Sequence, residues 1–566
     1  MKYERFMKIS KVTLGQEKAD LVLKNAEVVD VFTEEIHRAD VAVCDGIIAG
    51  IGSYYEGKEE TDLKGMYLMP GFMDAHLHLE STMVTPNELV SLAAAHGTTT
   101  FIVDPHEAAN VSGTAGIDYI LDQTEGSPAN VYVMMPSCVP ATEFDDNGCE
   151  LTAEKMAPYL NNPRILGLGE VMNDPGVVYG DRSLHEKLSL FEEKISDGHA
   201  PFLPSDELSA YALAGIRTDH ECTDYEYAME EIRRGIHVHI REGSAAHNLE
   251  AIVKGIVKHN TPTDCFSFCT DDKHIEDILR DGHIGYNVKK AIELGLSPLK
   301  AIKMATINTA RCYGLRHLGA LAPGYQADMV VMDSLEKPNI KAVFFKGKRI
   351  DPEKKPEIKA CPKELKETVH LSKLKEEDFR LPVKGNRVHI IELDPSQIST
   401  KHREKALRDT ENYIPANGLN KIAAVERHRG TGMIGIGICS RYGIENGAVA
   451  SSVSHDSHNI IVVGDNDRDM ALAVNAVIEA KGGYSLVEKG KVYDILPLPV
   501  MGLMSEAGYE EVSEKLERMI KKAHSMGISD DVDPFITLSF LALPVIPEIR
   551  ITPRGLLDTV EFKLIK

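Results

Sequence analysis

Two histidines stand two residues apart at the end of an apolar segment. The segment Leu68-Met-Pro-Gly-Phe-Met-Asp-Ala-His-Leu-His-Leu-Glu80 turns at Pro-Gly and then presents His76 and His78. Because side chains at i and i+2 of a β-strand point to the same face, both imidazoles aim at one point. Two neutral imidazoles at one point suit a divalent metal ion. Taken alone, the pair fits a strand with two surface histidines equally well, so the surrounding elements decide.

Length, charge and composition limit the classes of protein to which this chain can belong. The 566 residues fit three or four ordinary domains, or one large α/β barrel with attachments. The net charge of -23 argues against a nucleic-acid or anionic-membrane partner, which would require clustered Lys and Arg. Nine scattered cysteines fit reduced thiols. No apolar run approaches the length of a membrane span or follows the N-terminus as in a signal peptide, so we expect a cytoplasmic protein.

The middle of the chain, residues 70–318, alternates apolar strands with helical patterns. Helices are expected at Asn87–His96, at Asp224–Arg234 with Thr223 as its cap, and at Ala246–Lys258. Eight β/α repeats over this length predict a TIM barrel. The expected strands are Phe72–His78, Thr99–Asp104, Val131–Pro136, Ile165–Val171, Ile195–Ala200, Ile216–Glu221, His237–Arg241 and Phe266–Asp271.

The segments on either side of the barrel suggest further domains. Short β-rich runs in residues 1–69 and 319–350 predict a β-sandwich module that the barrel interrupts. Residues 351–385 are rich in Lys, Glu and Pro and are expected to form a linker. Strand-like and helical runs alternate again in residues 386–566, which predicts an additional C-terminal α/β domain.

In a TIM barrel the reactive groups lie at the carboxyl ends of the strands. Polar residues stand at those ends on five different predicted strands, and they would converge on one rim. Imidazole and carboxylate ligands in this number indicate a binuclear divalent-metal site that suits zinc, manganese or ferrous iron. The predicted ligands are His76, His78, Glu170, His199, His220 and Asp271.

Other motifs compete with this set. His237-Val-His239 is a second His-x-His that spacing cannot rank below the first. His78-Leu-Glu80 matches half of the zinc base-deaminase signature, but no Pro-Cys-x-x-Cys follows. Gly430–Gly435 matches a dinucleotide pattern but leads into a strand-like run, so we interpret it as a turn. Ser454–His458 fits a nucleophile or ligand cluster, and a polar loop is the simpler interpretation.

The chain resembles the amidohydrolase superfamily and, within it, the adenine deaminase family. The barrel opening and the closing segment Gly319-Ala-Leu-Ala-Pro-Gly-Tyr-Gln-Ala-Asp-Met-Val carry the first likeness. The second covers essentially the whole chain, including a C-terminal domain of adenine deaminase type. Its motifs are Leu77-His-Leu-Glu-Ser-Thr-Met-Val-Thr-Pro86, Asp104-Pro-His-Glu-Ala-Ala-Asn-Val111, Gly169-Glu-Val-Met172, Asp197-Gly-His-Ala-Pro201, Thr218-Asp-His-Glu221 and Cys269-Thr-Asp-Asp272.

The resemblance implies hydrolytic deamination of adenine to hypoxanthine and ammonia by a metal-activated hydroxide, as in purine salvage. It implies two divalent ions, manganese or ferrous iron with zinc as an alternative, bridged by Glu170. Asp271 would ligate and shuttle protons, whereas Asp272 is expected to point to the opposite face of the strand. The loop Pro201-Phe-Leu-Pro-Ser-Asp206 departs from the Pro-Gly-Leu-Ser-Gly of the family, and this departure bears on substrate fit.

Residues near the predicted site are candidates for holding the purine: Glu80, Ser81, His106, Glu107, Arg241 and Glu242. The expected partners are the small molecule adenine and further copies of the chain in a homo-oligomer. One alternative is another amidohydrolase that cleaves a cyclic amide or N-acyl bond, with the barrel and metals unchanged. A non-catalytic scaffold is a second alternative, and the presence of every expected ligand type argues against it.

Overall fold

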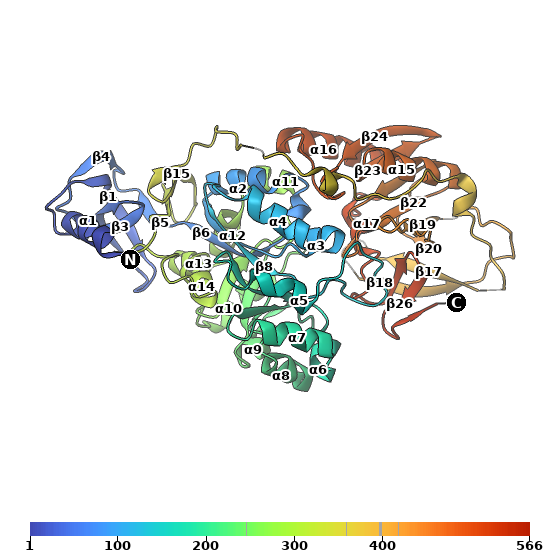
Figure 1. Ribbon diagram of the computed structural model, residues 1–566, viewed down its shortest axis with the longest axis horizontal. Coiled ribbons are helices and arrows are strands. Elements are labelled where there is room, and N and C mark those ends of the chain that lie inside the picture. Colours follow the sequence, from blue (N-terminus) through green and yellow to red (C-terminus); the bar gives the residue numbers. More distant parts are fainter. Residues whose placement is uncertain (245, 358, 386, 395–398, 417, 566) are drawn as a thin grey trace.

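The chain forms three regions along its longest axis (Figure 1). The computed structural model describes residues 1–566 except 245, 358, 386, 395–398, 417 and 566. A β-rich region formed largely by N-terminal residues lies at one end, parallel strands with their helices lie in the middle, and the C-terminal region lies at the other end.

Parallel strands form two sheets in the middle region. The order of the first is β10-β9-β8-β7-β6 and that of the second is β11-β12-β13. Parallel bridges link Leu77 with Asp271 and Ser196 with Ile216, so each edge of one sheet meets an edge of the other. The strands are β6 (Phe72–Leu77), β7 (Thr98–Val103), β8 (Asn130–Met135), β9 (Ile165–Val171), β10 (Ile195–Gly198), β11 (Thr218–Asp219), β12 (His237–Arg241) and β13 (Phe266–Cys269).

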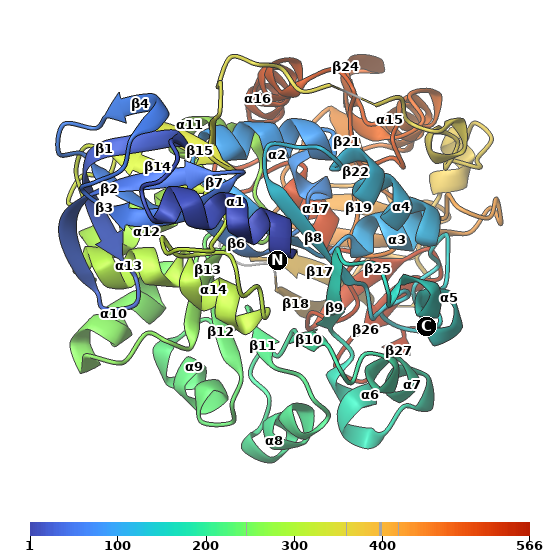
Figure 2. The ribbon, with the colours of Figure 1, turned by 60° about the vertical axis from the view of Figure 1, so that its left-hand side comes forward.

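Burial explains why these segments form strands between amphipathic helices. All residues of β6, β7 and β13 are buried, which fits the continuous apolar runs of strands covered on both faces. Helix α10 (Leu249–His259) buries Leu249, Ile252, Val253 and Ile256, a spacing that places one helical face on the strands. Figure 2 shows α8 (Ser205–Leu213), α9 (Tyr225–Ile232) and α10 outside strands β10 to β12.

Several details of the predicted elements are wrong, and the expected strand Ile216–Glu221 is reduced to β11 at Thr218–Asp219. Asp224, not Thr223, caps α9, because its side chain accepts a hydrogen bond from the Tyr227 amide at 2.8 Å. The strand β13 ends at Cys269 and does not continue to Asp271, whose φ of 58° lies in the left-handed region. A residue in that conformation breaks the alternation of an extended strand.

The segments before and after the middle region share one sheet. Its order is β16-β15-β14-β5-β1-β2-β3, with β4 also paired to β1. Strand β14 pairs antiparallel with β5, which joins residues far apart in the sequence. The strands are β1 (Ala19–Asp30), β2 (Glu35–Cys44), β3 (Ile47–Gly52), β4 (Gly57–Asp62), β5 (Tyr67–Pro70), β14 (Met329–Met332), β15 (Ile340–Phe345) and β16 (Lys348–Arg349).

The C-terminal region contains a sheet in the order β18-β17-β20-β19-β22-β21-β23-β24 and a small sheet β25-β26-β27. Gly430–Gly435 leads into β20, so the helix that a dinucleotide motif needs does not follow it. The strands are β17 (Val388–Leu393), β18 (Thr400–Lys405), β19 (Leu419–Val425), β20 (Ile434–Ser440), β21 (Gly447–Ser451), β22 (Ile460–Gly464), β23 (Gly483–Glu488), β24 (Lys491–Pro497), β25 (Ile549–Thr552), β26 (Gly555–Asp558) and β27 (Lys563–Leu564).

Helices connect and cover these sheets (Figures 1 and 2). The remaining α-helices are α1 (Tyr3–Thr13), α2 (Pro86–Ala95), α3 (His106–Ser112), α4 (Thr114–Gln123), α5 (Ala153–Met156), α6 (Asp174–Tyr179), α7 (Arg182–Leu190), α11 (Ile275–Asp281), α12 (Ile284–Glu293), α13 (Pro298–Met304), α14 (Ile307–Cys312), α15 (Asp467–Glu479), α16 (Tyr509–Ser525) and α17 (Ile536–Phe540). Among the described residues, no helix is long and apolar enough to cross a membrane.

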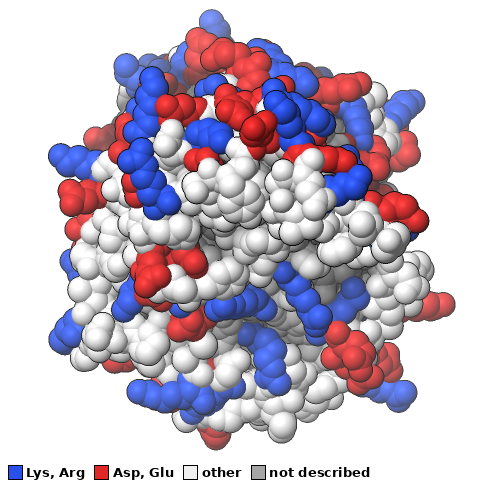
Figure 3. Space-filling model, turned by 90° about the vertical axis from the view of Figure 1, so that its left-hand side faces the viewer, with Lys and Arg blue, Asp and Glu red and all other residues white. Residues whose placement is uncertain are grey.

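Surface charge and cysteine state agree with the composition. On the face shown in Figure 3, Lys and Arg side chains lie interspersed with Asp and Glu. All nine cysteines are free thiols.

Candidate active site

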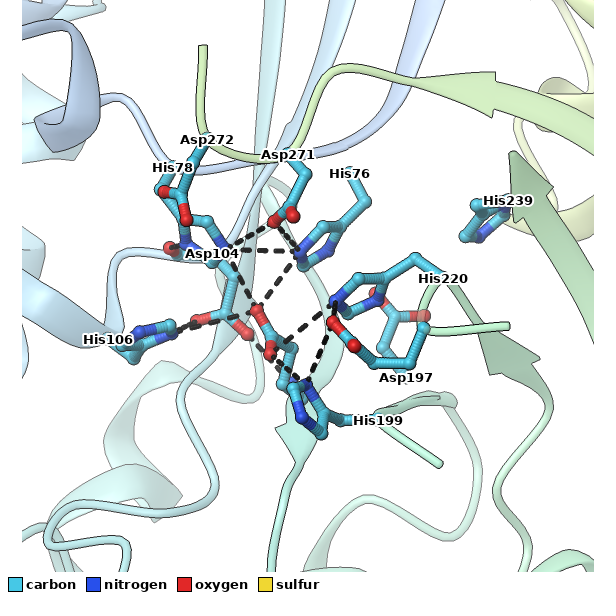
Figure 4. Close-up of polar contacts among 12 residues, drawn as sticks. His76, His78, Asp104, His106, Asp197, His199, His220, His239, Asp271 and Asp272 are labelled. Carbon is cyan, nitrogen blue, oxygen red and sulfur yellow. Dashed lines mark hydrogen bonds and ion pairs between the residues drawn. The ribbon is translucent and has the colours of Figure 1, made fainter. Parts of the chain in front are cut away.

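The six predicted ligands come together at one end of the parallel strands (Figure 4). His76 lies in β6 and Glu170 in β9, each next to the last residue of its strand. His199 and His220 directly follow β10 and β11. Each residue therefore reaches the site because its own strand ends there. The prediction that a His-x-His pair, a Glu, two further His and an Asp would converge agrees with this geometry.

Four donor atoms converge at the first His pair. The Nε2 atoms of His76 and His78 lie 3.2 Å apart. Glu170 Oε1 is 3.0 Å from the first nitrogen and 2.9 Å from the second. Asp271 Oδ1 is 3.7 Å and 3.2 Å from the same nitrogens. Two nitrogens and two carboxylate oxygens thus surround one point.

A second donor group lies on the other oxygen of Glu170. His199 Nδ1 is 3.1 Å and His220 Nε2 is 3.7 Å from Glu170 Oε2. Glu221 Oε1 is 3.6 Å from both imidazole nitrogens. Glu170 therefore stands between two groups of donors, one for each of its carboxylate oxygens.

Hydrogen bonds behind the donors fix their orientation. His78 Nδ1 lies 2.9 Å from the Asp104 carbonyl oxygen, so this nitrogen donates to the carbonyl and Nε2 is directed toward Glu170 and Asp271. The Glu170 amide donates to Asp104 Oδ2 at 2.7 Å. Asp197 accepts hydrogen bonds from the Tyr313 hydroxyl at 3.0 and 3.1 Å and from Thr218 Oγ1 at 2.8 Å. Buried neighbours thus support the site, as metal ligands require.

Electrostatic interactions favour the ionised carboxylates of Glu170 and Asp271. Burial raises the pKa of Glu170, but the surrounding imidazoles, His220 first, outweigh it and hold the pKa well below its usual value. Burial likewise opposes ionisation of Asp271, and the hydrogen bond to His78 and the charge of Arg241 hold its pKa well below 3.8. Burial lowers the pKa of His220 well below 6.5, which keeps this imidazole neutral, whereas the charge of Glu170 outweighs burial and raises the pKa of His76 and His78. Ionised carboxylates and a neutral imidazole are the forms that bind metal.

The donor set fits divalent metal ions. Glu170 is 3% exposed, and its Oε1 makes no hydrogen bond within the described part of the chain. A buried ionised oxygen without a hydrogen bond is costly unless a cation compensates it. Imidazole nitrogens with carboxylate oxygens suit manganese, ferrous iron or zinc. The residues present therefore fit the group that the resemblance implies.

The second His-x-His pair lies apart from this site. His239 Nε2 is 3.1 Å from the Tyr313 hydroxyl, and His237 Nε2 is 2.8 Å from Ser267 Oγ. Figure 4 shows His239 away from the donors around Asp271. The spacing of the residues did not show which His-x-His pair is the better candidate for a metal site. Their position along the strand does, because only the first pair stands at the carboxyl end of its strand.

The residues predicted to hold the purine differ in their position relative to the cavity beside the donors. His106 and Arg241 line a cavity of about 160 Å³ beside the donors. Ser81 Oγ lies 3.2 Å from Glu107 Oε1, and both side chains are buried. Arg241 Nη1 donates to Asp271 Oδ2 at 2.9 Å, and the same guanidinium pairs with Glu221.

The side chains of two further candidates, Glu80 and Glu242, bond to other groups of the protein. The Glu80 carboxylate accepts a hydrogen bond from the Ala108 amide at 3.1 Å. Glu242 pairs with Lys290 at 2.6 Å and with His247 at 3.0 Å. Those contacts hold the Glu242 side chain, so the structure does not bring it to the cavity.

The expectation that Asp272 points away from the site is wrong. Asp272 lines the same cavity as Asp271, and Ser81 Oγ donates to its carboxylate. The alternation rule fails here because β13 ends at Cys269 and Asp271 has a positive φ. Figure 4 shows Asp271 and Asp272 close to His78.

Sequence reasoning did not predict several residues of the cavity, and three of them besides Asp272 are charged or titratable. Glu221 directly follows His220, and this adjacency was a usable signal. His455 and Asp456 also line the cavity, although their motif was interpreted as a polar loop. No local pattern shows that a segment nearly 200 residues after β13 reaches the donor side chains.

Comparisons with known proteins cover both large regions. Residues 67–350 match the amidohydrolase family, and residues 397–563 match the adenine deaminase C-terminal domain. An adenine deaminase of Desulfitobacterium hafniense is 56% identical over 560 residues, 99% of this chain and 98% of that protein. Adenine deaminases of Clostridium acetobutylicum and Petrotoga mobilis are 44% and 43% identical, over 98% and 97% of this chain and 98% and 96% of theirs.

Proposed function

The chain belongs to the adenine deaminase family of amidohydrolases, and we propose that it hydrolyses adenine to hypoxanthine and ammonia at the site described above. The observation that carries this proposal is the identity of 56% that extends over 99% of the chain. The barrel and its metal ligands alone would fit many hydrolases. The C-terminal match to adenine deaminases favours deamination over the cleavage of a cyclic amide or N-acyl bond.

The site is proposed to hold two divalent ions. His76, His78 and Asp271 with Glu170 Oε1 would hold one, and His199 and His220 with Glu170 Oε2 would hold the other. Two bound ions would supply a water molecule whose pKa is lowered to about 7 and which is therefore nucleophilic at neutral pH. Manganese or ferrous iron is our first choice, with zinc as the alternative.

Asp271 is proposed to move the proton of the reaction. Water adds to the ring carbon that carries the amine, the carbon–nitrogen bond then breaks, and nitrogen leaves as ammonia. Asp271 would accept a proton from the attacking water and deliver it to the leaving amine. Its Oδ1 faces the imidazoles, while Arg241 donates to its Oδ2 at 2.9 Å and thereby fixes the carboxylate plane.

Residues at the cavity are proposed to hold the purine. His106 lines the cavity, and its Nδ1 makes no hydrogen bond within the described residues. Glu107 lies behind the cavity lining, with its Oε1 3.5 Å from His455 Nδ1. Burial raises the pKa of Glu107 well above 4.5, as does the charge of Glu80, so its carboxyl is able to donate a hydrogen bond toward the site. Ser81 holds Glu107 in place. Arg241 acts through Asp271 and Glu221, and we give Glu242 no contact with substrate.

We further propose that the eight parallel strands form a TIM barrel. The parallel bridges at both sheet edges support closure. The division into residues 1–69 with 319–350, 70–318, 351–385 and 386–566 stays a prediction. A homo-oligomer, a role in purine salvage and a cytoplasmic location stay predictions too, and the nine free thiols support the last.

Metal-replete enzyme incubated with adenine, adenosine and a cyclic imide tests the proposed reaction. We expect ammonia and hypoxanthine from adenine and little turnover of the other two. Hydrolysis of the imide without ammonia from adenine would favour the alternative amidohydrolase. Comparable turnover of adenosine would contradict a site for the free base.

A further inference from the structure

The far end of the chain closes the cavity over the proposed metal ligands. His455, Asp456 and Phe540 line this cavity together with His106 and metal ligands of the barrel strands. Figure 1 shows α17, which ends at Phe540, against the middle region. The wall opposite the metal ligands therefore comes from the C-terminal region, which the reaction described above does not use.

The loop that carries two of these residues is held by hydrogen bonds. The His455 amide donates to the Ser539 carbonyl oxygen at 2.9 Å. The Ser454 amide donates to His458 Nδ1 at 3.1 Å, and the His458 amide returns a bond to the Ser454 carbonyl oxygen at 2.6 Å. His458 thus acts inside the loop and fixes the positions of His455 and Asp456.

Polar atoms of the loop face the cavity without direct partners. Asp456 is 2% exposed, and its Oδ2 has no hydrogen-bond partner among the residues described. Asp456 Oδ1 lies 3.7 Å from His106 Nε2, and His455 Nδ1 lies 3.5 Å from Glu107 Oε1. These gaps are long for hydrogen bonds, and leaving a buried polar group unpaired is costly. The arrangement fits a ligand that inserts its own donors and acceptors.

The wall also has an apolar part, which includes a stacked pair of rings. The rings of His455 and Phe540 stack with centroids 5.0 Å apart and an angle of 17° between their planes. Leu543, Val545 and Ile546 continue this surface. A planar ligand with a polar edge matches such a wall.

We propose that Asp456, positioned by the His458 loop and flanked by His455 and Phe540, is a specificity-determining residue that hydrogen-bonds the edge of the purine base. This inference rests on the proposed function and deepens it, because it makes the C-terminal region part of the substrate site. The barrel strands supply the metal ligands and the proton carrier, and the C-terminal wall selects and orients the base.

The test compares Asp456→Asn and Phe540→Ala with the wild-type holoenzyme. We expect Asp456→Asn to raise KM for adenine about 2- to 10-fold, the scale for loss of one hydrogen bond between uncharged groups. We expect kcat to change much less and the metal content to stay at the wild-type value. Calorimetry with hypoxanthine, the product, should show the same loss of affinity without any catalytic step. Phe540→Ala should weaken hypoxanthine binding as well.

Matched controls come from the same C-terminal region. Asp494→Asn removes a carboxylate that pairs with Arg518 at the surface, and it should leave KM and hypoxanthine affinity unchanged. His389→Asn changes a histidine that contacts His402 instead of the cavity. Melting temperatures near that of the wild type show that each variant is folded, and if Asp456→Asn is unfolded, Phe540→Ala decides the matter by the same binding measurement.

Several outcomes overturn the proposal. If Asp456→Asn and Phe540→Ala bind hypoxanthine as the wild type does, the wall is not a substrate site. If Asp456→Asn or His455→Asn loses metal in step with activity, the loop holds a cation instead of the base. If wild-type enzyme binds adenine and hypoxanthine but releases no ammonia, the proposed function fails, and the wall is still judged by the binding of both bases to the variants.

Discussion

At the scale of single residues, Glu170 connects the two donor groups. Its oxygens face separate sets of imidazoles, with contacts of 2.9 and 3.0 Å on one side and of 3.1 and 3.7 Å on the other. A carboxylate between two donor groups is useful when two cations must be held about 3.5–4 Å apart. The bridging proposal therefore rests on this one side chain.

Glu170→Gln should lower both metal content and turnover, because an amide offers one neutral oxygen where the carboxylate offers two charged ones. Elemental analysis of the purified variant, beside its kcat, measures both effects. Glu242→Gln is the matched control, since Glu242 is equally buried but pairs with Lys290. Two metals and full activity in Glu170→Gln would rule out the bridging role.

Asp271 gives the sharpest prediction at this scale. Asp271→Asn should keep the fold and most of the metal, while kcat falls by a factor on the order of 10² to 10⁴, the range for loss of a general acid–base group. Asp272→Asn should reduce kcat less, because the Asp272 carboxylate is bonded to Ser81 rather than to the imidazoles. Turnover is measured with metal content for each variant. Equal losses at both positions would mean that the proton takes another route.

At the scale of elements, the ends of strands and helices decide which residues act. The six proposed ligands lie at or just past strand ends, and His237 and His239 lie within β12. The same scale explains the error at Asp272, because a strand that stops at Cys269 no longer dictates where the next side chains point. Predictions about side-chain direction hold only inside the element that produces them.

The cap of α9 offers a test of an element boundary. Asp224→Ala should lower the free energy of unfolding by about 1 kcal/mol, because the Tyr227 amide loses its acceptor. Thr223→Ala, one residue away and exposed, should cost little. Chemical denaturation of both variants compares them directly. A larger loss at Thr223 would restore the cap that the sequence suggested.

At the scale of the whole molecule, the site joins strands that are far apart in the sequence. Removing metal leaves buried carboxylates and imidazoles from β6 to β13 without a common partner. Chelated enzyme should therefore lose activity and melt at a lower temperature. Adding manganese or ferrous iron should restore both, with about 2.7 kcal/mol of stabilisation when free metal is 100 times its Kd.

A scan of melting temperature against metal concentration measures this linkage. Calcium at the same concentration is the control ion, because it prefers sets of six to eight oxygen ligands. A melting temperature that does not depend on metal, in enzyme shown to be metal-free, would mean that the ions do not contribute to the stability of the fold.

The sequence alone predicted which donor side chains lie together and most of the strands around them. His76, His78 and Glu170 belong to short motifs that can be recognised from neighbouring residues. The hydrophobic periods of two residues for strands and 3.6 for helices are also visible in the sequence. The same local rules placed β9 and β12 within their observed bounds. Features that depend only on neighbouring residues can therefore be predicted from the sequence.

Only the tertiary structure decided what faces these ligands. It placed His455 and Asp456 at the cavity, brought Asp272 to the same side as Asp271, and tied Glu242 to Lys290. Each outcome depends on packing between segments that are distant in sequence, or on a backbone turn where a strand ends. Composition and periodicity describe one element at a time, so they give no information about contacts between distant segments.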